Sequence, residues 1–429
     1  MICIRLFCIL VLCTVSVIVL LINYPLASEH LYRVHLRAKT QTDTTSVSIS
    51  RRINNNLTTS SMRKKQRTDE EDVTTKQSSR PSGEVKHALR RKQITVYRPF
   101  QGRFIGQIRR LNMKSCLANN CVVNIVYNET TKPINADAVV FQGNRVPRIR
   151  PKRRSTDQLF VFANTEPPGY VHYMDAVQLM RVNPEFYNWT MTYKSDSDVW
   201  MPYAHIIPRD IQKQNYLKPL QRGKPQENLV YSTNWTGIIG KDYNRVFDTK
   251  SKNTLWFVSH CVTPSKREKY VERMTKKMKI DIFGNCGKYK IKGNDTFNMQ
   301  YRFYLAFENS LCEDYITEKM YSWFSKDIIV VTYGGADYSK FVPDGTYINA
   351  ADFPSPETLA DFLNKLGSDR ERYIGYLKRK DQYQVITEQE SAQNAFCGLC
   401  WRLNNLNERQ YTKNMSKWWL QSCQTTPSL

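Results

Sequence analysis

The apolar residues of the chain form one long run near its start and many short runs further on. The long run covers residues 6–22, and 17 residues at about 1.5 Å each reach across most of a bilayer. A cleaved signal peptide is the alternative, but Pro25 lies unfavourably three residues before Ser28, the small residue at which cleavage could occur. We therefore predict an uncleaved membrane helix over residues 6–22, preceded by a cytoplasmic tail at residues 1–5.

The short runs are rich in β-branched and aromatic residues, as is typical of strands. Many are continuous rather than alternating, which indicates strands buried on both faces of a parallel sheet. Helical patterns at residues 266–279 and 313–326 separate the last four runs in a βαβαβ order. The pattern predicts an α/β fold with two Rossmann-like domains. Strands are expected at residues 122–127, 138–141, 159–162, 255–258, 280–283, 303–307 and 328–332.

Composition separates a polar stretch from the folded body. Residues 23–94 are dominated by polar and basic residues and have too few apolar ones to offset the entropy of ordering, so we expect a disordered stalk. The whole chain of 429 residues is 41% hydrophobic and 24% charged, which excludes disorder throughout and a small disulfide scaffold. We expect an N-terminal domain at residues 95–245, a C-terminal domain at 246–395 and a final segment at 396–429.

The formal net charge of +24 favours a polyanionic partner, which could be nucleic acid, acidic lipid or a phosphorylated substrate. A membrane helix keeps a protein away from DNA, so no nucleic-acid role is expected. Eight cysteines lie beyond the membrane helix, an even set that suits disulfides in the secretory lumen. Six N-x-Ser/Thr sequons lie there too, and glycosylation is expected at Asn56, Asn128, Asn188, Asn234, Asn294 and Asn414.

Polar residues follow three of the predicted strands. In open parallel sheets, ligands bind beyond the carboxyl ends of the strands, so these positions could line one crevice. Taken singly, each is explained as readily by a hydrated loop with turn-forming residues. The positions are Glu166, which precedes two prolines, then Ser259 and His260, and finally Glu308, Asn309 and Ser310.

The second predicted helix carries a polar face that could bind an anion. Apolar side chains repeat at helical spacing between residues 314 and 324, whereas Tyr315, Glu318 and Lys319 share another face. A phenol, a carboxylate and an ammonium could converge there on a ligand, close to backbone N–H groups that favour phosphate. An ordinary solvated helix face is an equal alternative.

The segment YRFYLAFENSLCEDYITEK, residues 301–319, resembles the signature of the Golgi α1,3/4-fucosyltransferases. The resemblance extends over about residues 110–429. It implies two Rossmann-like domains that face a cleft (the GT-B fold), with an acceptor-side N-terminal domain and a GDP-fucose-binding C-terminal domain. It also implies a single-pass type II Golgi membrane protein with a luminal catalytic body. The further matching segments are residues 186–193, 195–198, 202–203 and 280–287.

The resemblance implies roles for particular residues. Glu166 is expected to be the general base of an inverting single displacement, as it precedes a proline at the position of the family's acidic residue. Lys319 and Arg267 are expected to bind the donor pyrophosphate, and Glu318 the ribose hydroxyls. The other expected donor-binding residues are Val258, Ser259, His260, Tyr304, Asn309 and Tyr315. The sequence departs from the family's usual Asn at His260 and from its usual Lys at Arg302, which leaves the nucleotide contact at His260 open.

Two motifs allow more than one interpretation. Asp196-Ser197-Asp198 mimics the D-x-D metal motif of other glycosyltransferases, but the resemblance implies that no metal or other cofactor is required and that Mn²⁺ or Mg²⁺ at most stimulates. Four cysteines have spacings that could hold zinc. The resemblance and an oxidising lumen imply instead two disulfides that tie the final segment to the N-terminal domain. The disulfides are expected to link Cys116 and Cys121 to Cys397 and Cys400.

The resemblance thus implies an α1,3-fucosyltransferase that acts on GlcNAc of N-glycans or related glycoconjugates. Antennae of the Galβ1,4GlcNAc type and the core GlcNAc remain open as acceptors, as do the oligomeric state and the pairing of the other luminal cysteines. The alternatives are a Golgi transferase for another nucleotide sugar and an inactive glycan-binding Golgi protein. An assay for transfer discriminates between them.

Overall fold

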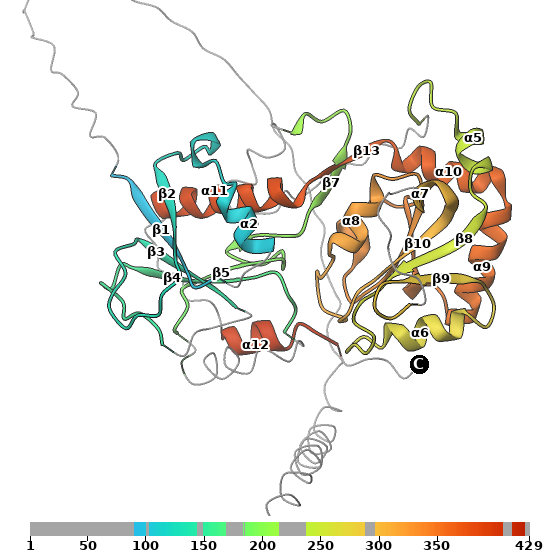
Figure 1. Cartoon of the computed structure of the whole chain (residues 1–429). Helices are drawn as coiled ribbons and strands as arrows, with labels where there is room; N and C mark the ends of the chain where they lie inside the picture. The colour runs from blue at the N-terminus through green and yellow to red at the C-terminus, as the bar shows by residue number, and fades with distance from the viewer. Residues whose placement is uncertain are drawn as a thin grey trace, which may run out of the picture. The chain divides into compact units, whose positions relative to one another are not determined.

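The computed structural model describes residues 90–99, 103–143, 149–168, 183, 185–213, 237–287, 297–405 and 414–424 (Figure 1). These residues belong to one compact unit, Val85–Leu429. The expected tail, the membrane helix at residues 6–22 and almost all of the stalk at 23–94 lie outside them, as do three sequons, Asn56, Asn234 and Asn294. Of the helices described, none is long and apolar enough to cross a bilayer.

The first half of this unit is built on a six-stranded sheet in which every strand pair is parallel. Its order is β2-β1-β3-β4-β5-β6. The central strands β3 and β4 are buried at every residue, which agrees with their continuous apolar runs. The strands are β1 Lys92–Tyr97, β2 Cys121–Val126, β3 Ala138–Gln142, β4 Leu159–Asn164, β5 Trp189–Thr192 and β6 Val199–Trp200.

The second half is built on a five-stranded parallel sheet of order β12-β11-β10-β8-β9. The chain leaves β8 for β9 on one side and returns for β10 on the other. The strand order therefore reverses between β8 and β10, which is where open α/β sheets bind ligands. The strands are β8 Lys252–Phe257, β9 Ile280–Phe283, β10 Tyr301–Phe307, β11 Ile329–Tyr333 and β12 Tyr347–Asn349.

Helices cover both sheets. Helix α9 illustrates how sequence sets a boundary, because Ser355 and Thr358 cap it reciprocally and Pro356 opens its first turn.

The remaining elements are a ribbon and the full set of helices. A two-stranded antiparallel ribbon pairs β7 His205–Pro208 with β13 Tyr383–Ile386. The helices are α2 Arg103–Arg109, α5 Tyr243–Asp248, α6 Arg267–Met274, α7 Phe297–Gln300, α8 Glu318–Phe324, α9 Pro356–Ser368, α10 Arg370–Lys380, α11 Glu388–Asn405 and α12 Met415–Leu420, with 3-10 turns at Met113–Ser115, Tyr338–Lys340 and Ala350–Asp352.

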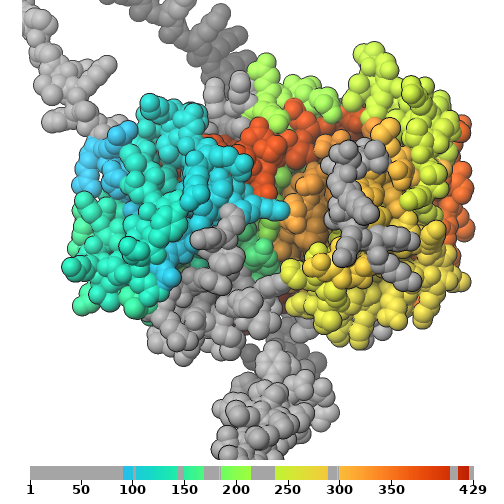
Figure 2. Space-filling model, in the orientation of Figure 1, coloured from blue at the N-terminus to red at the C-terminus, as the bar shows by residue number. Residues whose placement is uncertain are grey.

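The end of the chain returns to the first sheet. Phe396 and Leu399 of α11 share a core cluster with alternate residues of β1, β3 and β4, whereas Trp419 of α12 packs with the other face of the same strands. Atoms of this red segment lie at the surface between the blue and green residues of the first sheet and the orange residues of the second (Figure 2). The first sheet therefore needs the C-terminal segment to bury both of its faces.

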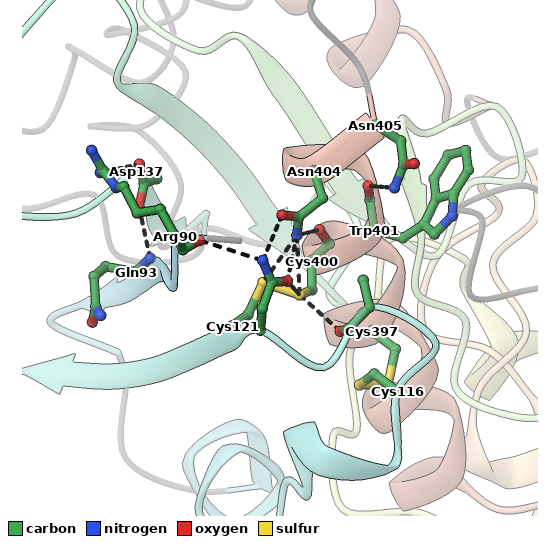
Figure 3. Close-up of a disulfide and its surroundings, with 12 residues drawn as sticks. Arg90, Gln93, Cys116, Cys121, Asp137, Cys397, Cys400, Trp401, Asn404 and Asn405 are labelled. Carbon is green, nitrogen blue, oxygen red and sulfur yellow. Dashed lines mark hydrogen bonds and ion pairs between the residues drawn. A yellow bond between two sulfur atoms is a disulfide. The ribbon is translucent and has the colours of Figure 1, made fainter. Parts of the chain in front are cut away.

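Disulfides fasten this return (Figure 3). They join Cys116 to Cys397 and Cys121 to Cys400, so the two bridges expected from the resemblance connect the start of the first sheet to α11. The pairings that the sequence left open are Cys261 with Cys286 and Cys312 with Cys423.

Several expected boundaries differ from the structure. Strand β1 begins at Lys92, so a domain start at residue 95 falls inside it, and the expected limits 245/246 and 395/396 fall inside α5 and α11. The helix expected at residues 313–326 covers only α8, because Asp314 has a positive φ of 58° and Thr317 is the N-cap. Tyr315 therefore lies in the preceding loop, not on a free helix face.

Candidate active site

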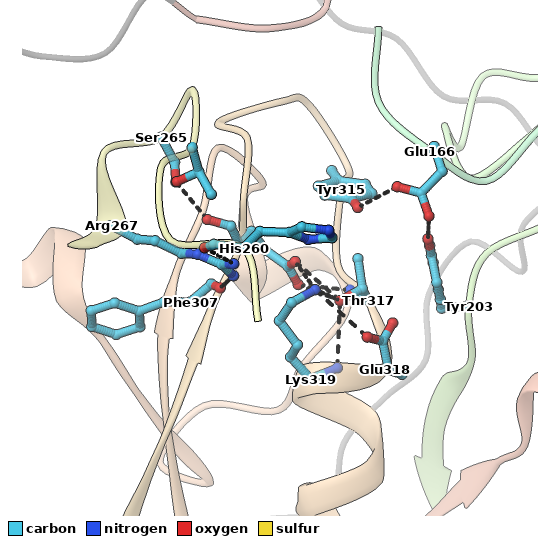
Figure 4. A network of polar contacts seen from close by, with 12 residues as sticks. Glu166, Tyr203, His260, Ser265, Arg267, Phe307, Tyr315, Thr317, Glu318 and Lys319 are labelled. Atoms are coloured by element: carbon cyan, nitrogen blue, oxygen red, sulfur yellow. Dashed lines mark hydrogen bonds and ion pairs between the residues drawn. The ribbon is translucent and has the colours of Figure 1, made fainter. Parts of the chain in front are cut away.

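The candidate site lies where loops after β4 and β10 meet (Figure 4). Glu166 follows β4, and Asn164 at the end of that strand fixes its backbone in both directions. The Asn164 amide donates to the Glu166 carbonyl at 2.9 Å, and the Glu166 N–H donates to the Asn164 Oδ1 at 3.2 Å. This local turn sets the direction in which the carboxylate leaves the first sheet.

Two buried phenols flank the carboxylate of Glu166. Tyr203, which lies just before β7, places its hydroxyl 3.4 Å from Oε1, and Tyr315, from the loop after β10, places its hydroxyl 3.4 Å from Oε2. The Tyr203 hydroxyl also donates to the carbonyl of Thr165 at 2.9 Å. The two tyrosines are 5% and 1% exposed, so one carboxylate is enclosed by residues from both halves of the unit.

This enclosure sets the pKa of Glu166. Burial raises it above the ordinary value for a glutamate, and the charge of Lys319 and a hydrogen bond from Tyr315 offset only part of the rise. A carboxylate of raised pKa is a stronger base than an exposed one, and perturbed groups of this kind gather at functional sites. The geometry suits proton abstraction from a hydroxyl group.

A second carboxylate, Glu308, anchors the cationic side of the site. It is 0% exposed, and it accepts hydrogen bonds from the N–H of Thr317 at 2.9 Å and from the ammonium of Lys319 at 2.9 Å. Lys319 also donates to the Thr317 hydroxyl at 2.7 Å. Burial alone lowers the pKa of Lys319, but Glu308 and Glu318 outweigh burial and raise it, so the ammonium stays charged.

Glu318 faces a cation from the first half of the unit. Arg103 of α2 places Nη1 3.3 Å from Glu318 Oε2 and 3.4 Å from Glu388 Oε2 at the start of α11. Burial raises the pKa of Glu318, but the charges of Lys319 and Arg103 prevail and hold it below its usual value. Glu318 is therefore an ionised acceptor, which suits the ribose-binding role expected of it.

Arg267 supports the ends of two neighbouring strands. Its guanidinium donates to the carbonyl of Phe307, the last residue of β10, at 2.6 Å, and to that of His260, three residues after β8, at 3.3 Å. The side chain is 3% exposed, burial lowers its pKa, and its Nε has no hydrogen-bond partner among the residues described. Its buried guanidinium holds together the two strand ends between which the strand order reverses.

The other expected donor-binding residues lie at varied depths around this point. Ser259 and His260 are exposed after β8, whereas Val258 is buried and pairs through its backbone with Phe283 and Cys286. Tyr304 lies in the middle of β10, 3% exposed, and its ring stacks on Trp323 at 4.3 Å, so the structure gives it a packing role. Asn309 is 7% exposed, and its Oδ1 finds no partner among the described groups.

The loop that carries Tyr315 is fastened from several sides. Asp314 accepts from the N–H and the hydroxyl of Ser195 at 2.9 and 2.6 Å, and the Lys194 ammonium donates to Glu313 at 2.6 Å. The disulfide Cys312–Cys423 ties the same loop to the C-terminal segment. These contacts support the positive φ at Asp314 and fix Tyr315 against Glu166.

The Asp-Ser-Asp motif has other partners. Asp198 accepts from the N–H and hydroxyl of Thr190 at 2.8 and 2.9 Å and lies 3.6 Å from Arg402, whereas Asp196 accepts from the indole of Trp418 at 2.7 Å. Both carboxylates therefore serve local structure. Across the described ranges, the structure contains no group of three or more His, Cys, Asp or Glu residues that could hold a metal ion.

The sequons differ in exposure. Asn128 and Asn414 are exposed, but Asn188 is 3% exposed and its Oδ1 accepts from the Phe160 N–H at 2.8 Å and from Arg153 at 2.7 Å. A glycan cannot be attached to this side chain in the folded protein. The burial of Asn188, immediately before β5, therefore argues against the glycosylation expected there, which stays a prediction.

The structure thus brings Glu166, Tyr315, Glu318 and Lys319 together, as expected. Sequence reasoning assigned no role to Tyr203, and it missed Arg103 entirely. The position of Tyr203 in a matching segment was a usable signal. Arg103 gave none, because it contacts residues more than 200 positions away.

Two family models match the chain over complementary regions. The model described as "Fucosyltransferase, N-terminal" matches residues 90–204, and "Glycosyltransferase family 10 (fucosyltransferase) C-term" matches residues 247–418. These regions contain the first sheet and all of the second, respectively. Every residue assigned to the candidate site above lies within one of them.

Curated relatives agree with these matches. Alpha-(1,3)-fucosyltransferase C of Drosophila melanogaster is 36% identical over 304 residues, which cover 67% of this chain and 66% of the relative. Alpha-(1,3)-fucosyltransferase fut-1 of Caenorhabditis elegans is 29% identical over 335 residues, which cover 74% and 68%. The chain thus spans about two thirds of the length of these relatives.

Among solved structures, an α1,3-fucosyltransferase crystallised with GDP matches with a TM-score of 0.48 at 14% identity, over 77% of this chain and 95% of that one. The two complementary family matches and the 36% identity to the Drosophila protein establish the relationship. The chain therefore belongs to the fucosyltransferases of glycosyltransferase family 10.

Proposed function

We propose that this family member transfers L-fucose from GDP-β-L-fucose, with inversion, to the 3-hydroxyl of GlcNAc in N-glycans or related glycoconjugates. The observation that carries the proposal is the single carboxylate of Glu166, enclosed by Tyr203 and Tyr315 and raised in pKa by burial. An inverting transfer needs one base for the acceptor hydroxyl and cationic groups for the leaving diphosphate. Both kinds of group are present in the same site.

In the proposed reaction, the acceptor oxygen attacks the anomeric carbon of fucose on the face opposite GDP. The new glycosidic bond forms as the bond to the phosphate oxygen breaks, and GDP leaves with the electron pair. Glu166 takes the hydroxyl proton. We assign neutralisation of the diphosphate's negative charge to two cations. They are Lys319, whose raised pKa keeps it cationic, and Arg267 at the ends of β8 and β10.

The two parallel sheets support a GT-B arrangement, in which the first sheet bears the acceptor side and the second sheet binds the nucleotide. The reversal of strand order between β8 and β10 supports donor binding to the second half. Four disulfides within the part of the chain described support folding in an oxidising compartment. We therefore place this part in the Golgi lumen, with residues 6–22 as a type II membrane anchor.

The acceptor is proposed only as a class. The human relative, 29% identical over 282 residues, is named a 3-galactosyl-N-acetylglucosaminide 4-alpha-L-fucosyltransferase, which supports a GlcNAc-containing acceptor. Galβ1,4GlcNAc antennae and the core GlcNAc of N-glycans both meet this description. The groups that enclose Glu166 do not distinguish between them.

A transfer assay tests the proposal. Purified full-length protein is incubated with GDP-fucose, GDP-mannose or UDP-galactose and a panel of antennary and core glycans. We expect transfer from GDP-fucose alone, with an α1,3 linkage to GlcNAc in the product. Transfer from another donor supports a different nucleotide-sugar transferase, and glycan binding without turnover supports an inactive lectin; either result contradicts the proposal.

A further inference from the structure

The two hydroxyl groups beside Glu166 differ in what they can offer it. Tyr203 is 2.9 Å from the carbonyl of Thr165 and 3.4 Å from Glu166 Oε1, whereas the Tyr315 hydroxyl lies 3.4 Å from Oε2. A phenol has one proton to donate. The Tyr203 hydroxyl donates it to the nearer group, the Thr165 carbonyl, which can only accept a hydrogen bond. Tyr203 therefore presents an oxygen lone pair to Oε1, whereas Tyr315 can donate its proton to Oε2.

We propose that Tyr203 is a positioning residue that stabilises the protonated form of Glu166, the form that the base adopts when it takes the acceptor proton. The inference rests on the proposed function, and it adds a residue to that reaction. The proton of the acceptor hydroxyl moves to Oε1 as the glycosidic bond forms and GDP departs. The new Oε1–H then donates to the Tyr203 oxygen, while the Tyr203 hydroxyl keeps its own proton and continues to donate it to the Thr165 carbonyl.

Tyr315 acts in the opposite sense, because a hydrogen bond to the ionised carboxylate favours the charged form. One phenol thus stabilises the base before proton transfer and the other stabilises it afterwards. A hydrogen bond that strengthens as the reaction proceeds contributes to kcat, whereas one made only to the free base does not.

The other groups that face Glu166 are charged, and they bear on its pKa in both directions. Lys319 lowers the pKa, and Glu318 and Glu308 raise it. None of these groups is altered by removing a phenol hydroxyl. Tyr203 itself is 5% exposed and lies two residues before β7, which pairs with β13, so its ring has little freedom to find another partner.

The test compares Tyr203→Phe with Tyr315→Phe in full-length protein. The readout is the acidic limb of the pH profile of kcat/KM, which reports the ionisation of the free base. Tyr315→Phe should move this limb to higher pH. Tyr203→Phe should move it to lower pH and reduce kcat by about two- to tenfold, the worth of one hydrogen bond, while KM for GDP-fucose changes little.

Tyr187→Phe is the matched control. Its hydroxyl is buried without a hydrogen-bond partner among the described groups, and its ring packs on Phe162 of the same sheet, so its loss should leave the profile unchanged. If Tyr203→Phe moves the limb to higher pH, Tyr203 is a donor to the carboxylate and the inference is wrong. An unmoved limb reduces Tyr203 to a backbone anchor and also overturns it. An inactive wild-type protein would instead refute the proposed function.

Discussion

Replacing Lys319 by methionine should destabilise the fold as well as the donor site. The ammonium lies 2.9 Å from Glu308 Oε2, and Glu308 is 0% exposed. Methionine keeps the length of the side chain but removes its charge. Glu308 then retains the hydrogen bonds from Thr317, at 2.9 to 3.0 Å, but no other ion pair within 4.0 Å among the residues described.

The cost follows from this burial. Removing one partner of a buried ion pair typically costs about 3–5 kcal/mol, because the other charge is left uncompensated. For a folded unit of this size, each kcal/mol lowers the melting temperature by roughly 1.4 °C, so a loss of roughly 4–7 °C is expected. Differential scanning fluorimetry measures this shift. Calorimetry measures the loss of GDP binding free energy, which is expected to exceed about 1.5 kcal/mol.

A double variant separates the two effects. Lys319→Met with Glu308→Gln removes the uncompensated charge, so most of the melting temperature should return while GDP affinity stays low. Lys340→Met is the control, because Lys340 is 67% exposed and its pair with Asp337, at 3.5 Å, should contribute little. The reasoning fails if Lys319→Met melts within about 1 °C of the wild type, or if the double variant is no more stable than the single one.

Three further predictions concern the rest of the fold. Serine at both Cys312 and Cys423 should lower kcat in a radiolabelled fucose assay, because this disulfide holds the loop of Tyr315; unchanged kcat would contradict this. Burial lowers the pKa of His205 from 6.5 to about 3, so the unfolded state binds a proton that the folded state excludes as pH falls. The free energy of unfolding in urea should therefore fall by about 2 kcal/mol between pH 8 and pH 5, and His205→Phe should remove that fall. The same pH dependence in His205→Phe as in the wild type would contradict this. Glycopeptide mass spectrometry should find Asn188 unmodified, and an occupied site would contradict its burial.

The sequence predicts the strands better than the helix of the site. Continuous apolar runs locate β3, β4, β10 and β11 to within about two residues, because strands buried on both faces have a local signature. The helix expected at residues 313–326 loses its first turn to tertiary contacts. Its apolar spacing is genuine, but Ser195 and Cys423 hold the preceding loop in another conformation.

The candidate site also has parts that the sequence predicts and parts that it does not. Glu166 follows a predicted strand and Lys319 lies within a predicted helix, so their positions relative to the sheets could be expected. What surrounds them could not be expected, because Tyr315 meets Glu166 over 149 positions of sequence and Tyr203 approaches from a third segment. The burial that raises the pKa of Glu166 arises only when these segments pack together.

The buried Asn188 makes the same point for a modification site. A three-residue sequon records which side chains are present, but the exposure of its asparagine depends on the strand register. Here Asn188 immediately precedes β5, and its side chain accepts hydrogen bonds inside the sheet. Only the folded structure shows that this asparagine is buried.

The kcat of Glu166→Gln tests the central claim most directly. Glutamine keeps the shape of the side chain but cannot take the proton, so kcat for fucose transfer should fall by about 10² to 10⁴ while GDP affinity changes little. Glu185→Gln, at an exposed position of the same half, is the matched control and should retain wild-type kcat. If the Glu166→Gln protein folds normally and keeps kcat within about fivefold of wild type, Glu166 is not the base and the account is contradicted.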